Sequence, residues 1–279
     1  MLNYSEKELE KQATKIRLRT WDMIYKAGTG HTGGDLSIAD ILSVLYFNIL
    51  NVDPENPKDP DRDIYIQSKG HAAEVLWTTL ALRGFFEEEI LDTYYELESP
   101  LIGHPTNKMP GIEMNTGSLG HGLSISTGVA LASKLDNKNN SVYTLLGDGE
   151  LAEGSSWEAA MAASHYKLNN LIAIIDRNQL QITGKTVDVM SAEPLKEKWE
   201  AFGWNVVTID GHNYKQLLQE LSNNDSPDQP KIIIADTVKG KGISFVEGEA
   251  SWHHDVPNDE EYEKGLQELQ SKLEELENE

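Results

Sequence analysis

The amino-acid sequence predicts an α/β fold: a mostly parallel sheet with helices on both faces. Short runs of consecutive apolar residues, such as 142–146 and 171–175, have the length of buried strands. Segments with helical periodicity separate these runs, and strands that alternate with helices form parallel sheets through right-handed crossovers. The 279 residues contain no internal repeat, low-complexity segment or evident linker. We therefore expect one domain spanning residues 1–279.

Helical segments dominate the first half of the chain. Apolar residues recur every three or four positions from Leu9 to Met23, which predicts the first helix. A glycine-rich turn at 28–35 should end it, and a second helix should follow with Ser37 as its N-cap. The other elements expected before residue 142 are a proline-broken loop at 51–61, a strand at 63–67, a helix after His71, helical structure around 87–96, a loop at 100–117 and a helix at 119–135.

In the second half, strands at 142–146 and 171–175 should flank a helix at 153–168. Its apolar positions, which fall at helical spacing, are Trp157, Ala160, Met161 and Ser164. Further strands are predicted at 205–209 and 231–235. The acidic segment 258–279 should form a terminal helix that docks through a leucine stripe, with partner binding as the alternative. The stripe consists of Leu266, Leu269, Leu273 and Leu276.

Composition excludes several classes of function. Lys and Arg number 24 against 46 Asp and Glu, and the formal net charge of -22 argues against nucleic acid as a partner. The chain contains no cysteine, which excludes disulfides, thiolate chemistry and a Cys-based zinc site. Its amino terminus lacks the apolar core of a signal peptide, and no segment reaches the roughly 18 apolar residues of a membrane helix. We expect a cytoplasmic protein that is not embedded in a membrane.

The most informative motif is Gly147-Asp148-Gly149, which Asn178 follows after 30 residues. Asp148 and Asn178 come just after two neighbouring predicted strands, so both should lie at the sheet edge where α/β folds bind ligands. A carboxylate and an amide oxygen suit Mg²⁺ held partly by phosphates, and the glycines allow backbone N–H groups to approach a phosphate. Taken alone, the motif could also be an ordinary turn at the end of a strand.

A second glycine motif, residues 28–33, matches Gly-x-Gly-x-x-Gly. A dinucleotide site needs a strand before this motif, whereas a long helix is predicted here, so we reject a nicotinamide site. Several histidines stand in glycine-flanked loops, a pattern that suits proton transfer with sugar hydroxyls. They also suit zinc, although no pair has the spacing of a hydrolase motif. The histidines in such loops are His31, His71, His104, His121, His253 and His254, whereas His165 and His212 are expected to be structural.

The Gly-Asp-Gly…Asn pattern resembles the thiamine diphosphate motif. Along nearly its whole length the chain resembles the amino-terminal half of transketolase, in the order and spacing of many segments. These are Gly30-His31-Thr32-Gly33-Gly34, Asp61-Arg62-Asp63, Ser68-Lys69-Gly70-His71-Ala72, Gly103-His104-Pro105, Asn115-Thr116-Gly117-Ser118-Leu119-Gly120, Asp210-Gly211-His212, Thr237-Val238-Lys239-Gly240-Lys241-Gly242 and Ser251-Trp252-His253.

The resemblance implies a role for each matching residue. Thiamine diphosphate and Mg²⁺ (or Ca²⁺ or Mn²⁺) would be the cofactors. The metal would be held by Asp148, Asn178 and the carbonyl of Leu180. The implied catalytic residues are His31, His71, His104 and His253. The implied cofactor-binding residues are His71, Gly117, Leu119, Gly147, Asp148, Gly149, Glu153, Asn178, Lys239 and His253.

Two of these residues have a second interpretation, and three positions depart from the family pattern. Lys239 could be a solvated loop cation, and Glu153, which matches a glutamate linking two active sites, could simply favour a helix N-terminus. Arg177 precedes Asn178 where the family usually has Asn or Asp. His254 replaces a glycine, which leaves open whether His253 or His254 faces the cofactor. His121 stands where full-length members commonly have glutamine.

The resemblance also implies a partner chain. In transketolases, a second domain from another subunit provides the glutamate that activates thiamine diphosphate, and this chain matches the first domain only. The implied function is transfer of a two-carbon ketol unit from a ketose (phosphate) to an aldose, by a split transketolase of two copies of each half (α2β2). The alternatives are the α subunit of a 2-oxo-acid dehydrogenase and a non-catalytic cofactor-binding module.

Overall fold

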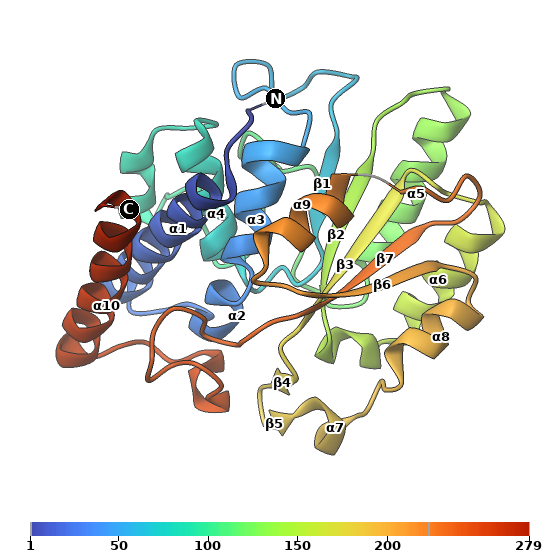
Figure 1. Ribbon diagram of the computed structural model, residues 1–279. Coiled ribbons are helices and arrows are strands. Elements are labelled where there is room, and N and C mark those ends of the chain that lie inside the picture. The colour runs from blue at the N-terminus through green and yellow to red at the C-terminus, as the bar shows by residue number, and fades with distance from the viewer. Residues whose placement is uncertain (1, 223, 279) are drawn as a thin grey trace.

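A five-stranded, wholly parallel sheet with the order β1-β2-β3-β7-β6 forms the centre of the computed structural model, which describes residues 2–222 and 224–278 (Figure 1). All five predicted strands are confirmed. Their bounds are β1 Ile64–Gln67, β2 Val142–Gly147, β3 Leu171–Arg177, β6 Asn205–Asp210 and β7 Lys231–Asp236. The register pairs Gly147 with Asp176 and Arg177 with Asp236, so the carboxyl ends of β2, β3 and β7 lie side by side.

Helices cover both faces of this sheet, as predicted (Figure 1). Successive strand residues point to opposite faces. Leu145 and Ile174 therefore join the core beneath the first group of helices, and Leu146 and Ile175 join the core beneath the second. The first group comprises α1 (Glu6–Ala27), α3 (Ala39–Val44), α4 (Ala73–Arg83) and α9 (Tyr214–Ser222), and the second comprises α5 (Gly122–Leu135), α6 (Gly154–His165) and α8 (Leu195–Ala201).

The terminal helix α10 (Asp259–Asn278) lies along α1, as expected for the acidic segment; residue 279 is outside the described residues. Leu269 and Leu276 are buried, and Gly265 allows α10 to lie directly against Trp21. A third apolar cluster, containing Trp21 and Trp252, joins α10 to the chain that follows β7. The leucine stripe is thus used within the chain.

Several short elements differ from the sequence prediction. The expected turn at 28–35 contains a short helix, α2 (Thr32–Leu36), and Ser37 is not an N-cap. The Ser37 hydroxyl instead donates to Asp176, because burial beside a carboxylate offers a charged acceptor. The helical spacing predicted for α6 is confirmed, with Ala160 buried and Trp157 packed against the core, but Met161 does not share their buried face. Met161 is 55% exposed, whereas Ser156, Ala159, Ala160 and Ala163 are buried, since small side chains let α6 approach the sheet closely.

The remaining elements are short. The sequence prediction missed a two-stranded antiparallel sheet in the segment after β3, which Figure 1 shows below the main sheet. Its strands are too short to carry a periodic signal. The bounds are η1 Leu45–Ile49, η2 Glu88–Thr93, η3 Gly149–Ala152, β4 Leu180–Gln181, β5 Gly184–Lys185, α7 Thr186–Val189 and η4 Ala250–His253.

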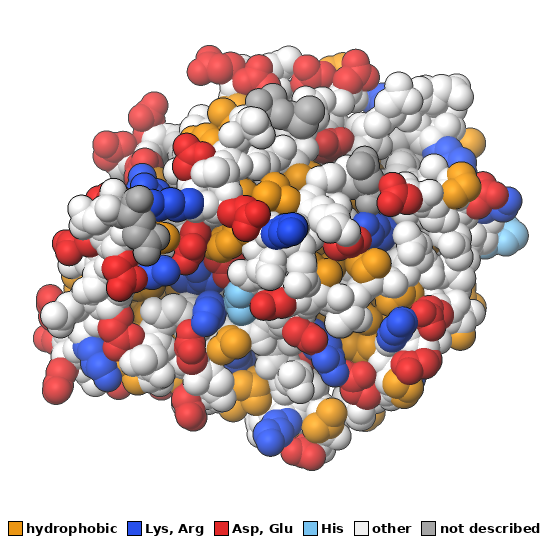
Figure 2. All heavy atoms as spheres, in the orientation of Figure 1, with side chains coloured by type: hydrophobic (Ala, Val, Ile, Leu, Met, Phe, Trp, Pro, Cys, Tyr) orange, Lys and Arg blue, Asp and Glu red, His pale blue; other side chains and the backbone are white. Residues whose placement is uncertain are grey.

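Acidic side chains are spread over the face of the molecule drawn in Figure 2, with fewer Lys and Arg side chains between them. This distribution is the one expected from the formal charge of -22. None of the helices in the described part of the chain is long and apolar enough to cross a membrane.

Candidate active site

The loops that follow four strands enclose one cavity at the carboxyl edge of the sheet. Its volume is about 450 Å³. The loop after β1 brings His71, the loop after β2 brings Asp148, the loop after β3 brings Asn178, and the loop after β7 brings Lys239. The predicted residues that line this cavity are His31, His71, Gly117, Leu119, Gly147, Asp148, Gly149, Asn178, Leu180, Lys239 and His253.

The three predicted metal-binding residues are held together by backbone hydrogen bonds. The two carboxylate oxygens of Asp148 accept from the N–H groups of Gly149 at 2.8 Å and Gln179 at 2.7 Å. The Asn178 side-chain oxygen accepts from the N–H of Leu180 at 3.1 Å. Burial and then Asp176 raise the pKa of Asp148 to about 7. A cation would favour its ionised form, and these oxygen donors fit Mg²⁺.

A buried ion pair that the sequence analysis missed lies beside these residues. Lys69 Nζ is 2.6 Å from Asp176 Oδ2, and both side chains are almost fully buried. Asp176 also accepts from Asn178 Nδ2 at 2.9 Å, and Lys69 donates to the carbonyl of Gly34 at 2.8 Å. Burial opposes ionisation, but Lys69 holds the pKa of Asp176 below its ordinary value. An acidic residue at the end of an otherwise apolar strand was the available signal.

Glu150, also missed, shapes the Gly-Asp-Gly loop. Its buried carboxylate accepts from the N–H groups of Gly147 at 3.1 Å and Gly120 at 2.8 Å, and from the Ser68 hydroxyl. A side chain at Gly149 would come within 2.8 Å of Gln181. Glu150 therefore ties this loop to two others, and a glycine keeps the backbone accessible, as a diphosphate cradle requires.

Four of the predicted histidines form a cluster at the cavity. The ring centre of His31 is 5.2 Å from His71, 5.7 Å from His253 and 6.4 Å from His104. Burial is the first cause that lowers the pKa of each, to about 3 for His31, about 2 for His71 and about 4 for His253, with His104 also lowered. Near neutral pH these imidazoles are therefore uncharged, and each ring has one nitrogen that can accept a hydrogen bond.

Polar atoms at the cavity are left for a ligand to satisfy. Within residues 2–222 and 224–278, two residues that line the cavity have buried nitrogen atoms without a hydrogen-bond partner, His31 Nδ1 and Gln181 Nε2. Buried polar groups are normally paired, so their positions suit a ligand that carries hydroxyl or phosphate oxygens. In the same part of the chain no three His, Asp or Glu side chains form a group that could hold a metal ion.

The adjacent His253 and His254 lie in different surroundings. His253 lines the cavity and its ring stacks on that of His71 at 5.5 Å. Lys239 Nζ is 2.9 Å from His253 Nδ1, so a protonated Lys239 makes Nδ1 the acceptor and leaves the proton on Nε2. His254 is exposed, with its ring 4.5 Å from that of His31.

Lys239 is only 2% exposed, which rules out the interpretation as a solvated cation. Its Nζ is also 3.4 Å from the carbonyl of Leu180, a predicted metal ligand. Burial, followed by Lys69, lowers the pKa of Lys239 to about 8. Lys239 is thus a buried cation that contacts both the histidine cluster and the expected metal site.

Two predicted residues are not among those that line the cavity. His104 lies next to Gly117, where an added side chain would come within 2.5 Å of the imidazole; the φ of +145° at Gly117 also requires glycine. Glu153 is exposed at the N-cap of α6 and makes no capping hydrogen bond. Its role in linking two active sites stays a prediction.

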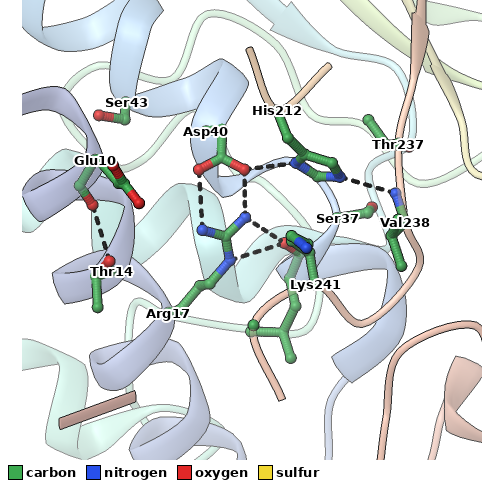
Figure 3. A network of polar contacts seen from close by, with 12 residues as sticks. Glu10, Thr14, Arg17, Ser37, Asp40, Ser43, His212, Thr237, Val238 and Lys241 are labelled. Atoms are coloured by element: carbon green, nitrogen blue, oxygen red, sulfur yellow. Dashed lines mark hydrogen bonds and ion pairs between the residues drawn. The ribbon is translucent and has the colours of Figure 1, made fainter. Parts of the chain in front are cut away.

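His212 holds the loop that carries Lys239. Its Nδ1 is 2.7 Å from Asp40 Oδ2, and its Nε2 accepts from the N–H of Val238 at 2.9 Å. Figure 3 shows Asp40 between Arg17 and His212, with the imidazole continuing the chain to Val238. Arg17 donates to both Asp40 oxygens, at 2.9 and 2.6 Å. The expectation of a structural His212 agrees with these contacts.

We expect His212→Ala to lower the free energy of unfolding by about 1–3 kcal/mol, because it removes one hydrogen bond from the buried Asp40 carboxylate and leaves the backbone N–H of Val238 without its acceptor. Denaturant unfolding of this chain measures the effect. His165→Ala is the matched control, since His165 is exposed at the end of α6. Equal losses in the two variants would contradict a role for the Asp40–His212–Val238 chain.

A family model confirms what this geometry indicates. The model of the transketolase thiamine diphosphate-binding domain matches residues 9–272. The chain belongs to the transketolase family. The predicted family, fold and class of enzyme, a transferase of ketol groups, are therefore confirmed, and thiamine diphosphate is the cofactor bound by this family domain. The 2-oxo-acid dehydrogenase alternative is not favoured.

Several relatives have about the same length as this chain. An apulose-4-phosphate transketolase subunit of Phocaeicola vulgatus is 48% identical, with 97% of each chain covered. The 6-deoxy-6-sulfo-D-fructose transketolase subunit SqwG of Clostridium sp. is 43% identical, with 94% of this chain and 96% of that one covered.

Other transketolases are about twice as long. The crystal structure of Campylobacter jejuni transketolase superposes with a TM-score of 0.89 at 32% identity; the match covers 99% of this chain but 46% of that one. Human transketolase is 38% identical over 95% of this chain and 42% of its own length. This transketolase chain thus spans a little under half of these longer relatives.

Proposed function

We propose that this protein is the amino-terminal subunit of a two-subunit transketolase that moves a two-carbon ketol unit from a ketose to an aldose. The single observation that carries the proposal is the meeting of two sets of residues at one cavity. Oxygen donors from Asp148, Asn178 and Leu180 lie beside uncharged histidines at the carboxyl edge of the sheet. The names of the relatives of similar length, which are transketolase subunits, support it.

Thiamine diphosphate and a divalent metal, Mg²⁺ first, are the proposed cofactors. When bound, thiamine diphosphate supplies the nucleophile and electron sink needed to break the bond beside a ketose carbonyl. Asp148, Asn178 and the Leu180 carbonyl would hold the metal, and Gly149 would offer its backbone to the diphosphate. Gly117 and Leu119 would contact the aminopyrimidine ring.

The histidines would handle the sugar. His31 offers a buried, unpartnered Nδ1 to a hydroxyl, and His104 lies against Gly117, with its ring centre 6.4 Å from that of His31. Their lowered pKa values keep both rings uncharged, so each has a ring nitrogen that can accept a hydrogen bond from a hydroxyl, and we assign His104 as the base that assists bond cleavage. His253 would present Nε2–H to the reacting centre, with His71 stacked beside it.

The remaining parts of the proposal concern partners and location. A carboxyl-terminal transketolase chain would supply the activating glutamate, in an α2β2 assembly with this chain as a single diphosphate-binding domain in the cytoplasm. Apulose 4-phosphate is the first donor to test, from the name of the 48% identical relative. A sulfonated ketose and the pentose phosphates are the other two candidate substrates to test.

The test is a two-carbon transfer assay with thiamine diphosphate and Mg²⁺, using this chain alone and then with the carboxyl-terminal chain encoded beside its gene. We expect transfer only in the mixture. Saturable cofactor binding without transfer would mean that the donor is a different ketose. No cofactor binding by the mixture would contradict catalysis and leave the non-catalytic module as the function.

A further inference from the structure

Two carboxyl groups are buried together beneath the histidine cluster, and the proposed ketol transfer does not use them. Asp35 lies in α2, the short helix that follows His31, and Glu74 lies in the first turn of α4, three residues after His71. Both side chains are 0% exposed. An isolated buried carboxylate is costly, so two of them in contact require a compensating interaction.

In each carboxyl group, one oxygen accepts a hydrogen bond and the other oxygen has no donor among the described residues. Asp35 Oδ1 accepts from the N–H of Val75 at 3.1 Å, and Glu74 Oε1 accepts from the Tyr94 hydroxyl at 2.6 Å. Asp35 Oδ2 and Glu74 Oε2 are buried and accept from no donor in the described part of the chain. Two carboxylate oxygens are both acceptors, so Asp35 Oδ2 and Glu74 Oε2 can form a hydrogen bond with each other only if one of them carries a proton.

The neighbouring groups favour such a proton. Burial, then the charge of Glu74 and a hydrogen bond with it, raise the pKa of Asp35 well above its ordinary range; burial also raises the pKa of Glu74. The charged and titratable groups that act on the pair are Lys69, from the loop before α4, and Tyr94. Lys69 already forms an ion pair with Asp176, so Asp35 and Glu74 do not have a cation of their own.

The same contacts join three segments that carry active-site histidines. The N–H of Asp35 donates to the carbonyl of His31 at 3.1 Å, and Glu74 belongs to the helix that begins just after His71. Tyr94 begins the segment that leads to His104, and its hydroxyl is 3.8 Å from the position that a side chain on Gly103 would occupy.

We propose that Asp35 and Glu74 share one proton and that the resulting chain, Tyr94–Glu74–Asp35–Val75, positions His31, His71 and His104 relative to one another. Tyr94, Glu74 and Asp35 are positioning residues in this proposal, since the histidines alone would touch the sugar. The role of the histidines rests on the proposed transketolase function, whereas the shared proton does not.

The first experiment tests the shared proton by denaturant unfolding of the full chain between about pH 5 and 8. In the unfolded chain both groups ionise near pH 4, so the shared proton is taken up on folding, and its stabilisation is lost as pH rises through the folded pKa. In Asp35→Asn, the amide N–H can donate to Glu74 and the amide oxygen can accept from the N–H of Val75, but the amide takes up no proton in this pH range. Across the window, the ratio of the wild-type and Asp35→Asn unfolding constants should change by about tenfold per pH unit. A constant ratio would overturn the proposal.

The second experiment tests positioning without any substrate. Tyr94→Phe removes the hydroxyl donor, and Tyr143→Phe is the matched control, because the Tyr143 hydroxyl is equally buried but donates to Leu221 in another part of the core. We expect the ring resonances of His71 and His104 to shift in Tyr94→Phe and to stay in place in Tyr143→Phe. Unshifted resonances, or equal shifts in the two variants, would overturn the positioning role.

An activity measurement separates this inference from the proposed function. With the partner chain present, Tyr94→Phe should lower kcat by about tenfold while the affinity for thiamine diphosphate stays within about twofold, since tenfold corresponds to a small misplacement of catalytic groups. Shifted resonances in a protein whose mixture with the partner chain binds no thiamine diphosphate would contradict the proposed function and leave the positioning role intact. An unchanged kcat in an active enzyme would contradict the positioning role alone.

Discussion

Two-carbon transfer by the two-subunit enzyme should fall on the order of 1,000-fold in Asp148→Ala, equivalent to about 4 kcal/mol of transition-state stabilisation. Asp148 is the only carboxylate in the proposed metal set, and it also fixes the N–H groups of Gly149 and Gln179. Loss of this carboxylate removes the charged metal ligand. It also removes two hydrogen bonds that hold the loop proposed to bind the diphosphate. The measurement pairs initial rates at saturating cofactor with titration calorimetry of thiamine diphosphate and Mg²⁺.

Two further variants show whether the lost activity of Asp148→Ala comes from the metal site or from the loop. Asp148→Asn keeps the shape and an acceptor oxygen but lacks the charge, so it should retain the fold and still lose metal affinity. Asp188→Ala, an exposed acid in α7 near the same cavity, should behave as wild type. Transfer by Asp148→Ala at the wild-type rate, with unchanged Mg²⁺ affinity, would contradict the proposed metal site.

Lys69→Met should have the largest effect on stability, a loss of about 3–5 kcal/mol in the free energy of unfolding. Lys69 is 2% exposed and supplies the cation for Asp176, which is 0% exposed. Methionine fills much of the same volume but leaves the buried carboxylate without a counter-charge, close to the carboxylate of Asp148. Denaturant unfolding of the isolated chain measures the loss.

An exposed ion pair is the matched control for this variant. Lys196 and Glu200 form an i,i+4 pair with side chains 58% and 50% exposed, and Lys196→Met should change stability by no more than about 1 kcal/mol. The double variant Lys69→Met/Asp176→Asn should recover part of the loss, because the uncompensated charge is gone. Equal losses of stability in Lys69→Met and Lys196→Met would show that the buried ion pair stabilises the fold no more than an exposed one does.

The sequence predicted the sheet better than it predicted the helix faces and short elements. Strands β1, β2, β3 and β7 were recognisable because a strand buried on both faces is a short, largely apolar run, whereas the edge strand β6 is only partly buried. The buried face of α6 does not include Met161, because small residues, which carry little hydrophobic signal, form that face. Serine is a common N-cap residue, and this is why the sequence suggested Ser37 as one. Its hydroxyl instead donates a hydrogen bond to Asp176, a carboxylate far away in the sequence.

The sequence by itself determined the order of the strands along the chain, the placement of Asp148 and Asn178 at two strand ends, and the family to which the motifs belong. These features depend on local apolar patterns and fixed spacings, which the chain carries in one dimension. The spatial strand order β1-β2-β3-β7-β6 brought residues far apart in sequence to one edge of the sheet.

Only the tertiary structure decided which charges are buried and what balances them. Lys69 meets Asp176 across 107 positions, and Val75 donates to Asp35 across 40. The lowered pKa values of His31, His71 and His253 likewise have burial as their first cause, which packing alone creates. Long-range contacts set the dielectric surroundings of each group, and no local pattern encodes them.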